Sequence, residues 1–152
     1  MANIYVTTSG NDSTGTGTSA KPYRTIEKAI AVSTDGDEIV IGDGEYQSVG
    51  DTKGLNPKSN TTLRAANYPE LLGPVGDPRG MWTGPHKVII NQVNWSKHAI
   101  QLAKKSNVTI IGLEIKNANY GIDIGGSDGK NYRNTVKKLP DTRLRWQRHI
   151  HY

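Results

Sequence analysis

Short segments in which hydrophobic and polar residues alternate dominate this chain. The clearest example is the stretch of residues 106–126, where aliphatic residues occupy every second position of three short runs. The alternating pairs are Val108/Ile110, Leu113/Ile115 and Ile122/Ile124. Because side chains point alternately to the two faces of a strand, this pattern predicts three strands that each bury one face. Gly112 allows a bend between the first two strands, and Asn107 and Asn117 favour left-handed bends on either side.

The same reasoning predicts strands along most of the chain. They are residues 3–8, Glu38–Ile41, Thr61–Ala65, Lys87–Ile90, Ala99–Leu102, Val108–Ile111, Leu113–Lys116 and Gly121–Ile124. Their centres lie about ten to twenty-five residues apart with no helical pattern after residue 34, which argues against a sheet of βαβ units. A β-sandwich also alternates, but it usually shows clear two-residue hairpin turns. The pattern therefore predicts about four or five stacked coils of parallel strands, a β-solenoid.

One short amphipathic helix is predicted near the N-terminus, from about Thr25 to Ser33. Ile26, Ala29 and Ile30 fall at positions i, i+3 and i+4 and form one apolar stripe. The hydroxyl of Thr25 can accept a backbone N–H and so act as an N-cap. So narrow a stripe fits a helix that covers the open end of a solenoid and hides an otherwise aggregation-prone edge.

The composition agrees with a narrow solenoid core. At 152 residues the chain has the length of a single domain. The 34% of hydrophobic residues, the 17 glycines and the absence of phenylalanine suit short strands joined by many turns. Intrinsic disorder is the alternative, but the aliphatic clusters at residues 88–90 and 108–111 argue against it. Cysteine is absent, which excludes disulfides, a thiol nucleophile and a thiolate metal site.

The formal charge of +5 comes from the C-terminal end of the chain. Residues 130–152 hold seven Lys or Arg and one Asp, a net +6, which leaves residues 1–129 at −1. A nearly neutral body lacks the basic stripe of a nucleic-acid-binding protein, so no nucleic-acid partner is expected. No apolar run reaches the ~18–20 residues of a membrane span, so no membrane partner is expected either. Met1 leads directly into the first strand without the pattern of a signal peptide.

Two parts of the chain resemble secreted proteins of the pectate-lyase-like superfamily. The segments Ile4–Ser13, Pro22–Ile30 and Gly36–Tyr46 are similar to the N-terminal cap of these proteins, and Asn107–Gly126 is similar to one of their coils. The resemblance covers about residues 3–127 and implies an all-β fold, a right-handed parallel β-helix with one short N-terminal capping α-helix. The β-helix domain would comprise residues 1–136, with its cap at residues 1–34. An extracellular location is expected by the same resemblance.

Residues 137–152 form a basic tail that has neither a strand pattern nor a counterpart in the family. One hypothesis is a truncated or frame-shifted product, because a new coil begins at Thr135 and is not completed. The other is a genuine C-terminal cap formed by the apolar residues of the tail. Hydrogen exchange separates the two, since a docked cap is protected and a loose tail is not.

The resemblance implies action on an acidic, pectate-like polysaccharide. In such polysaccharide lyases, calcium neutralises a uronate carboxylate while an Arg or Lys base removes the neighbouring proton in a β-elimination. Calcium is therefore the expected cofactor. The chain departs from the lyase pattern at Tyr120-Gly121, where an Asp is expected, and at residues 130–134, which replace a Trp-x-Asp-His-type segment. The alternative is a non-catalytic carbohydrate-binding, adhesin or phage-tail module, and the oligomeric state stays open.

Candidate site residues lie on predicted outer strand faces. Asp123 points outward from its strand and Asp128 lies in the following turn, which makes them a candidate calcium pair. The alternative is that they are solvated acids, since calcium needs several oxygen ligands. Lys116 also points outward, beside Glu114, and is a candidate substrate-binding residue. A simple surface charge pair between Glu114 and Lys116 is the alternative.

A Pro/Gly-rich insertion at Pro69–Pro85 supplies two further candidates. Long loops on solenoids often form binding walls. Arg79 and Trp82 are expected to bind substrate, because arginine pairs with uronates and an exposed tryptophan stacks on sugar rings. Packing of Trp82 against the solenoid is the alternative. His98, which begins a strand, is expected to be structural.

Overall fold

The computed structural model describes residues 1–48, 54–67, 88–92, 98–118, 120–123 and 133–137 of the chain. This part is mostly β-structure with one short helix, α1, at Ile26–Val32. The strands are β1 (Asn3–Val6), β2 (Glu38–Ile41), β3 (Gly44–Ser48), β4 (Thr62–Ala65), β5 (Val88–Gln92), β6 (His98–Gln101), β7 (Thr109–Ile111), β8 (Glu114–Lys116), β9 (Tyr120–Asp123) and β10 (Thr135–Lys137).

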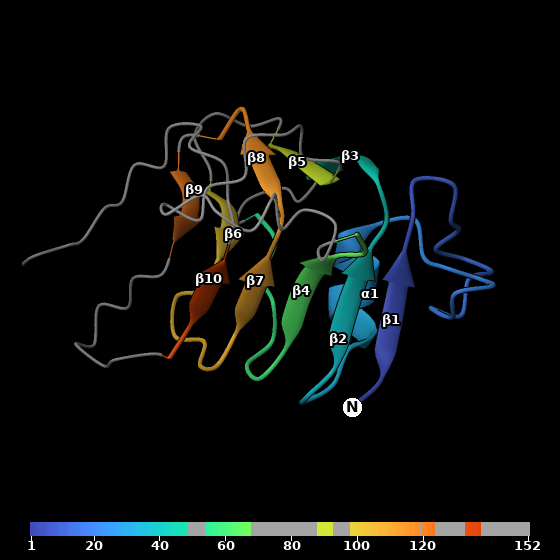
Figure 1. The fold of residues 1–152 in the computed structure, drawn as a ribbon, viewed down its shortest axis with the longest axis horizontal. Coiled ribbons are helices and arrows are strands. Elements are labelled where there is room, and N and C mark those ends of the chain that lie inside the picture. The colour runs from blue at the N-terminus through green and yellow to red at the C-terminus, as the bar shows by residue number, and fades with distance from the viewer. Residues whose placement is uncertain (49–53, 68–87, 93–97, 119, 124–132, 138–152) are drawn as a thin grey trace, which may run out of the picture.

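The strands form three parallel sheets. Sheet A has the order β1-β2-β4-β7-β10, sheet B has the order β3-β5-β8, and sheet C consists of β6 and β9 (Figure 1). The chain visits these sheets in turn: β4, β5 and β6 are followed by β7, β8 and β9, and then by β10 back in sheet A. An isolated parallel bridge between Leu55 and Ile100 places the segment after β3 beside sheet C as well. From β2 onward, consecutive strands therefore belong to different sheets, and each strand pairs with the strand one pass earlier or later.

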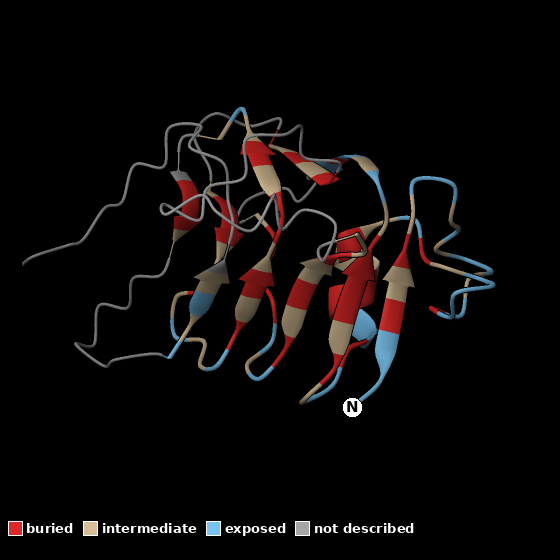
Figure 2. Cartoon of the chain, viewed as in Figure 1, coloured by how far each residue is buried: buried red, intermediate tan, exposed pale blue. Residues whose placement is uncertain are grey.

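The parallel register places hydrophobic side chains of successive strands on top of one another. In sheet A, Ile39 lies opposite Leu63, and Leu63 lies opposite Ile110. In sheet B, Tyr46, Ile90 and Ile115 stack in the same way, and Ile100 stacks on Ile122 in sheet C. These side chains belong to one buried cluster that includes residues from all three sheets. Figure 2 shows the buried positions running along the strands, while the exposed ones lie mainly in the turns.

Left-handed residues at the turns keep successive passes in register. The predicted bends are confirmed, because Asn107, Gly112 and Asn117 have φ values of 56°, 69° and 58°. Asn60, with φ of 59°, occupies the equivalent turn one pass earlier than Asn107. The Asn107 amide donates to Asn60 Oδ1 at 2.8 Å, and the Asn60 amide donates to Asp35 Oδ1 at 2.5 Å. This ladder of side-chain hydrogen bonds ties three passes together.

The predicted helix and its N-cap are confirmed. The Thr25 hydroxyl accepts the Lys28 backbone N–H at 3.2 Å, and Ile26, Ala29 and Ile30 are buried in the core cluster. The free side of β1 is also occupied, because Tyr5 donates to Gly17 O at 2.8 Å and Thr7 donates to Tyr23 O at 2.9 Å. The N-terminal segment thus covers the first edge of sheet A.

The predicted strands agree with the structure to within one or two residues, with two additions. One is β3 at Gly44–Ser48, where no strand was predicted. The last strand, β10, continues through Lys137 rather than stopping at Val136. The insertion at Pro69–Pro85 and residues 138–152 lie outside the described residues. In the part of the chain that the structure describes, no helix is long and apolar enough to cross a membrane.

Ile110 and Ile111 test which face of sheet A carries the core. Ile110 is fully buried between Leu63 and Val136, whereas Ile111 faces outward and is only partly buried. We expect Ile110→Ala to lower the free energy of unfolding by about 2–5 kcal/mol. The matched variant Ile111→Ala is expected to cost about 1 kcal/mol or less. Urea denaturation of both proteins measures the difference, and equal losses would contradict the inward register of β7.

Candidate functional site

Polar side chains gather on the outer face of sheet B. Alternation turns Tyr46, Ile90 and Ile115 into the core, so the residues beside them in each strand point away from it. The outward residues are Glu45 and Gln47 on β3, Ile89 and Asn91 on β5, and Glu114 and Lys116 on β8. The register of the core therefore determines which groups this face presents to solvent.

Three of these side chains form a hydrogen-bonded network across all three strands. Glu45 accepts the Lys116 ammonium on Oε2 at 2.5 Å and the Asn91 amide on Oε1 at 2.6 Å. The Asn117 amide, at the turn after β8, donates to Asn91 Oδ1 at 2.9 Å. We refer to Glu45, Asn91, Lys116 and Asn117 as the sheet B network. It joins residues from three successive passes of the chain.

The hydrogen bonds of the network hold the Glu45 carboxylate and the Lys116 ammonium in place, yet both groups remain accessible from solvent. Hydrogen bonds from Lys116 first, and from Asn91 second, lower the pKa of Glu45 from its ordinary value of 4.5. The side chains of Lys116 and Glu45 are nevertheless 38% and 39% exposed. Exposed ion pairs contribute little to stability. The ion pair therefore contributes little to the stability of the fold, and both of its side chains are accessible from solvent.

A cleft of about 650 Å³ adjoins this face. Its lining comes from the N-terminal segment and from β3: Thr8, Arg24, Thr25, Ile26, Glu27, Glu45, Tyr46 and Gln47. The two sides meet closely, since a Cβ on Gly44 would lie 2.5 Å from the Thr8 methyl group. Glu45 lines the cleft and also belongs to the sheet B network, so cleft and network are contiguous.

Several lining groups are held by the protein itself. Asp12 accepts the backbone N–H groups of Arg24 and Thr25 at 2.8 and 3.1 Å and the Thr25 hydroxyl at 2.7 Å. Burial acts to raise the pKa of Asp12, but the hydrogen bonds from Thr25 and Arg24 lower it overall. Asp12 thus binds the backbone N–H groups just before α1. The Arg24 side chain takes no part in these hydrogen bonds.

Tyr46 is an uncharged residue in the lining of the cleft. Its hydroxyl donates to Gly42 O at 2.8 Å. Burial first, and the charge of Asp43 second, raise the pKa of Tyr46 to about 12. The phenol therefore stays protonated at physiological pH.

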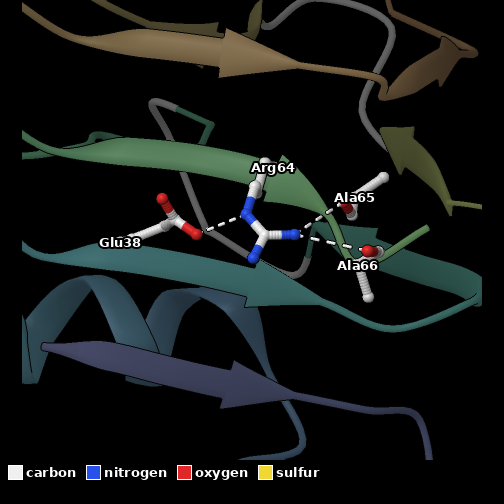
Figure 3. Close-up of polar contacts among 4 residues, drawn as sticks. All are labelled: Glu38, Arg64, Ala65 and Ala66. Carbon is white, nitrogen blue, oxygen red and sulfur yellow. Dashed lines mark hydrogen bonds and ion pairs between the residues drawn. The ribbon is translucent and has the colours of Figure 1, made fainter. Parts of the chain in front are cut away.

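The charged side chains Glu38 and Arg64 on the outer face of sheet A bind groups of the protein itself. The Arg64 guanidinium binds the Glu38 carboxylate and also donates to Ala65 O at 3.4 Å and Ala66 O at 3.3 Å (Figure 3). Val40 on β2 faces the same side as Glu38, opposite Arg64, and is almost fully buried. This face offers an arginine that is already coordinated by the protein, which makes it a weaker candidate than sheet B.

Lys116, predicted as a substrate-binding residue, lies within the candidate site. Its partner is Glu45, two strands away, rather than Glu114 on its own strand. Sequence reasoning missed Glu45 and Asn91. The alternation of Glu45, Tyr46 and Gln47 after Gly44 is the local signal for β3, and no strand was predicted there.

Asp123, predicted as a calcium ligand, lies at the end of β9. Its Oδ2 is 3.8 Å from His98 Nε2 on the neighbouring strand β6. Its proposed partner Asp128 lies outside the described residues, as do Arg79 and Trp82. Among the described residues, no three acidic or histidine side chains are grouped so that they could hold a metal ion. The calcium site therefore stays a prediction, and no chemical step is derived from it.

One family model matches the chain. It is DUF1565, described as a protein of unknown function, and the match extends over residues 8–142. The family is β-helix-like in general, which agrees with the parallel strands described above. No curated protein and no solved structure matches the chain.

The pKa of Glu45 tests the network directly. Without the Lys116 ammonium we expect the pKa of Glu45 to rise toward 4.5, so Lys116→Met should shift the titration of its carboxyl carbon, followed by NMR, to higher pH. Because the folded-state pKa is lowered, the pair stabilises the protein above the unfolded pKa, and this contribution is lost as the pH falls through the folded value. The stability difference between wild type and Lys116→Met should therefore shrink on acidification.

Lys104→Met is the matched control for this titration. It removes a lysine charge from an exposed turn and should leave the Glu45 titration unchanged. An unchanged Glu45 titration in Lys116→Met would show that the ion pair does not form in solution.

Proposed function

The chain belongs to the DUF1565 family, and we propose that it is a right-handed parallel β-helix that binds acidic polysaccharide on the outer face of sheet B. The observation that carries the functional part is the sheet B network, in which Lys116 is oriented by Glu45 on a half-exposed surface. The resemblance of residues 3–46 and 106–126 to pectate-lyase-like proteins supports the same class of ligand.

The β-helix assignment is supported by how the passes repeat. The passes β4–β6 and β7–β9 each place one strand in each of the three sheets, all pairings are parallel, and inward residues stack in register. Left-handed asparagines recur at equivalent turns of successive passes. These features are typical of a solenoid whose repeats each contact only their neighbours. The right-handed sense is inferred from the family resemblance and from the strong preference of parallel crossovers for that hand.

The ligand class follows from the chemistry of the network. A lysine ammonium has three N–H donors, and Glu45 accepts one of them, so others remain for a uronate carboxylate. Gln47, Asn91 and Asn117 add amide groups that can donate to and accept from sugar hydroxyls. The outer face of sheet B also carries the carboxylates of Glu45 and Glu114, so the proposed contact to an acidic sugar chain depends on the remaining N–H donors of Lys116 and on the amides.

The same geometry limits what Lys116 can do in catalysis. An ammonium bound to a carboxylate has no free lone pair, so in this arrangement Lys116 binds an anion but does not remove a proton. β-Elimination, the activity that the pectate-lyase-like resemblance predicts, would need a base elsewhere. The predicted contributions of Arg79, Trp82 and calcium at Asp123 and Asp128, and the extracellular location, are further parts of this proposal.

Binding to polygalacturonate tests the proposed function. We expect calorimetric titration to show binding of polygalacturonate and much weaker binding of its fully methyl-esterified form, which lacks the carboxylate charge. Lys116→Met is expected to reduce affinity about tenfold, equivalent to about 1.4 kcal/mol. Lys104→Met, which removes a charge away from sheet B, should bind like the wild type. Equal affinity for the acidic and esterified polymers, or an unaffected Lys116→Met, would contradict the proposal.

The same mixtures separate binding from cleavage. A rise in ultraviolet absorbance from unsaturated sugar ends, dependent on calcium and abolished by a chelator, would identify a lyase. A flat trace from folded protein that still binds the polymer would identify the non-catalytic alternative.

A further inference from the structure

The cleft lies where the outer face of sheet B ends. β3 is the edge strand of this sheet, and the residues beyond it are Thr8 and the segment 24–27 of the N-terminal cap. A ligand that crosses β8, β5 and β3 on the outer face therefore reaches a wall formed by the cap. Glu45 stands at the boundary, since it binds Lys116 on one side and lines the cleft on the other.

Arg24 is the cation among the lining residues of the cleft, which also include the carboxylates of Glu27 and Glu45. Its side chain is exposed, and within the described ranges no acidic side chain forms an ion pair with it. The backbone N–H groups of Arg24 and Thr25 are bound by Asp12, and that of Lys28 by the Thr25 hydroxyl. The planar guanidinium of Arg24 can bind a carboxylate through two parallel hydrogen bonds.

The remaining lining groups suit a sugar ring better than a small inorganic anion. Gln47, Thr8 and Glu45 supply an amide, a hydroxyl and a carboxylate that can hydrogen-bond sugar hydroxyls. The volume of about 650 Å³ lies within the range of ligand pockets, roughly 300–1,000 Å³.

We infer that this cleft binds the terminal uronate of the polysaccharide, with Arg24 on its carboxylate, while the following sugar units lie across sheet B. Because the N-terminal cap closes this side of the binding face, the protein would bind the end of a polysaccharide chain rather than an internal segment. This inference rests on the proposed function, because it places the terminal sugar of the same polysaccharide at one end of the sheet B face.

The stoichiometry of binding distinguishes the two modes. We expect calorimetric titration of wild-type protein to give about one protein per chain both for hexagalacturonate and for a polygalacturonate fraction several times longer. If internal segments are bound, the number of proteins per chain increases with chain length, which would overturn this inference and leave the proposed function intact. Absence of binding to either chain would overturn the proposed function and this inference together.

Arg24→Gln tests the assigned contact. It is expected to weaken binding of hexagalacturonate about tenfold. Lys21→Gln, which removes a charge from the exposed loop before Arg24 without altering the cleft lining, should bind like the wild type. Equal affinity of Arg24→Gln and Lys21→Gln would overturn the assignment of Arg24. Circular dichroism of both variants verifies that the fold is retained, and the stoichiometry test needs no variant.

Discussion

The in-register stacking of aliphatic side chains is the constraint on which the rest of this structure depends. Ile39, Leu63 and Ile110 occupy equivalent positions in successive strands of sheet A, and Tyr46, Ile90 and Ile115 do so in sheet B. Because side chains alternate between the two faces, a shift of one residue would move an entire row from the core to the solvent. The register is therefore fixed by burial, and it determines what the outer faces carry.

The candidate site is a direct consequence of that register. Glu45, Asn91 and Lys116 come from parts of the chain that are far apart in sequence, since Lys116 follows Glu45 by 71 positions. They meet because each one adjoins a buried residue of the same stacked row. The N-terminal cap adds the second component, since Asp12 fixes the start of α1 and so places Arg24 beside β3. Core, cap and cleft thus form one connected arrangement.

How much could be predicted from the sequence depended on whether the signal was local. The segment from Asn107 to Lys116 was predicted closely, because strict alternation and a left-handed Gly112 leave little freedom. The helix was predicted together with its Thr25 cap for the same reason. β3 was missed because Gly44 and the preceding Asp43 are typical of a turn, and the strand begins within that turn. The pairing of Lys116 with Glu45 could not be predicted, since it depends on the register between passes rather than on neighbouring residues.

The most direct test of this account is to locate the ligand on the protein. Backbone amide signals can be followed by NMR while hexagalacturonate is added to the isotope-labelled chain. The account predicts shifts at Gln47, Asn91 and Lys116 on sheet B and at Arg24 in the cleft, with little change at Thr62 and Thr109 on the outer face of sheet A. Shifts confined to sheet A, or no shifts in the presence of saturating ligand, would contradict it.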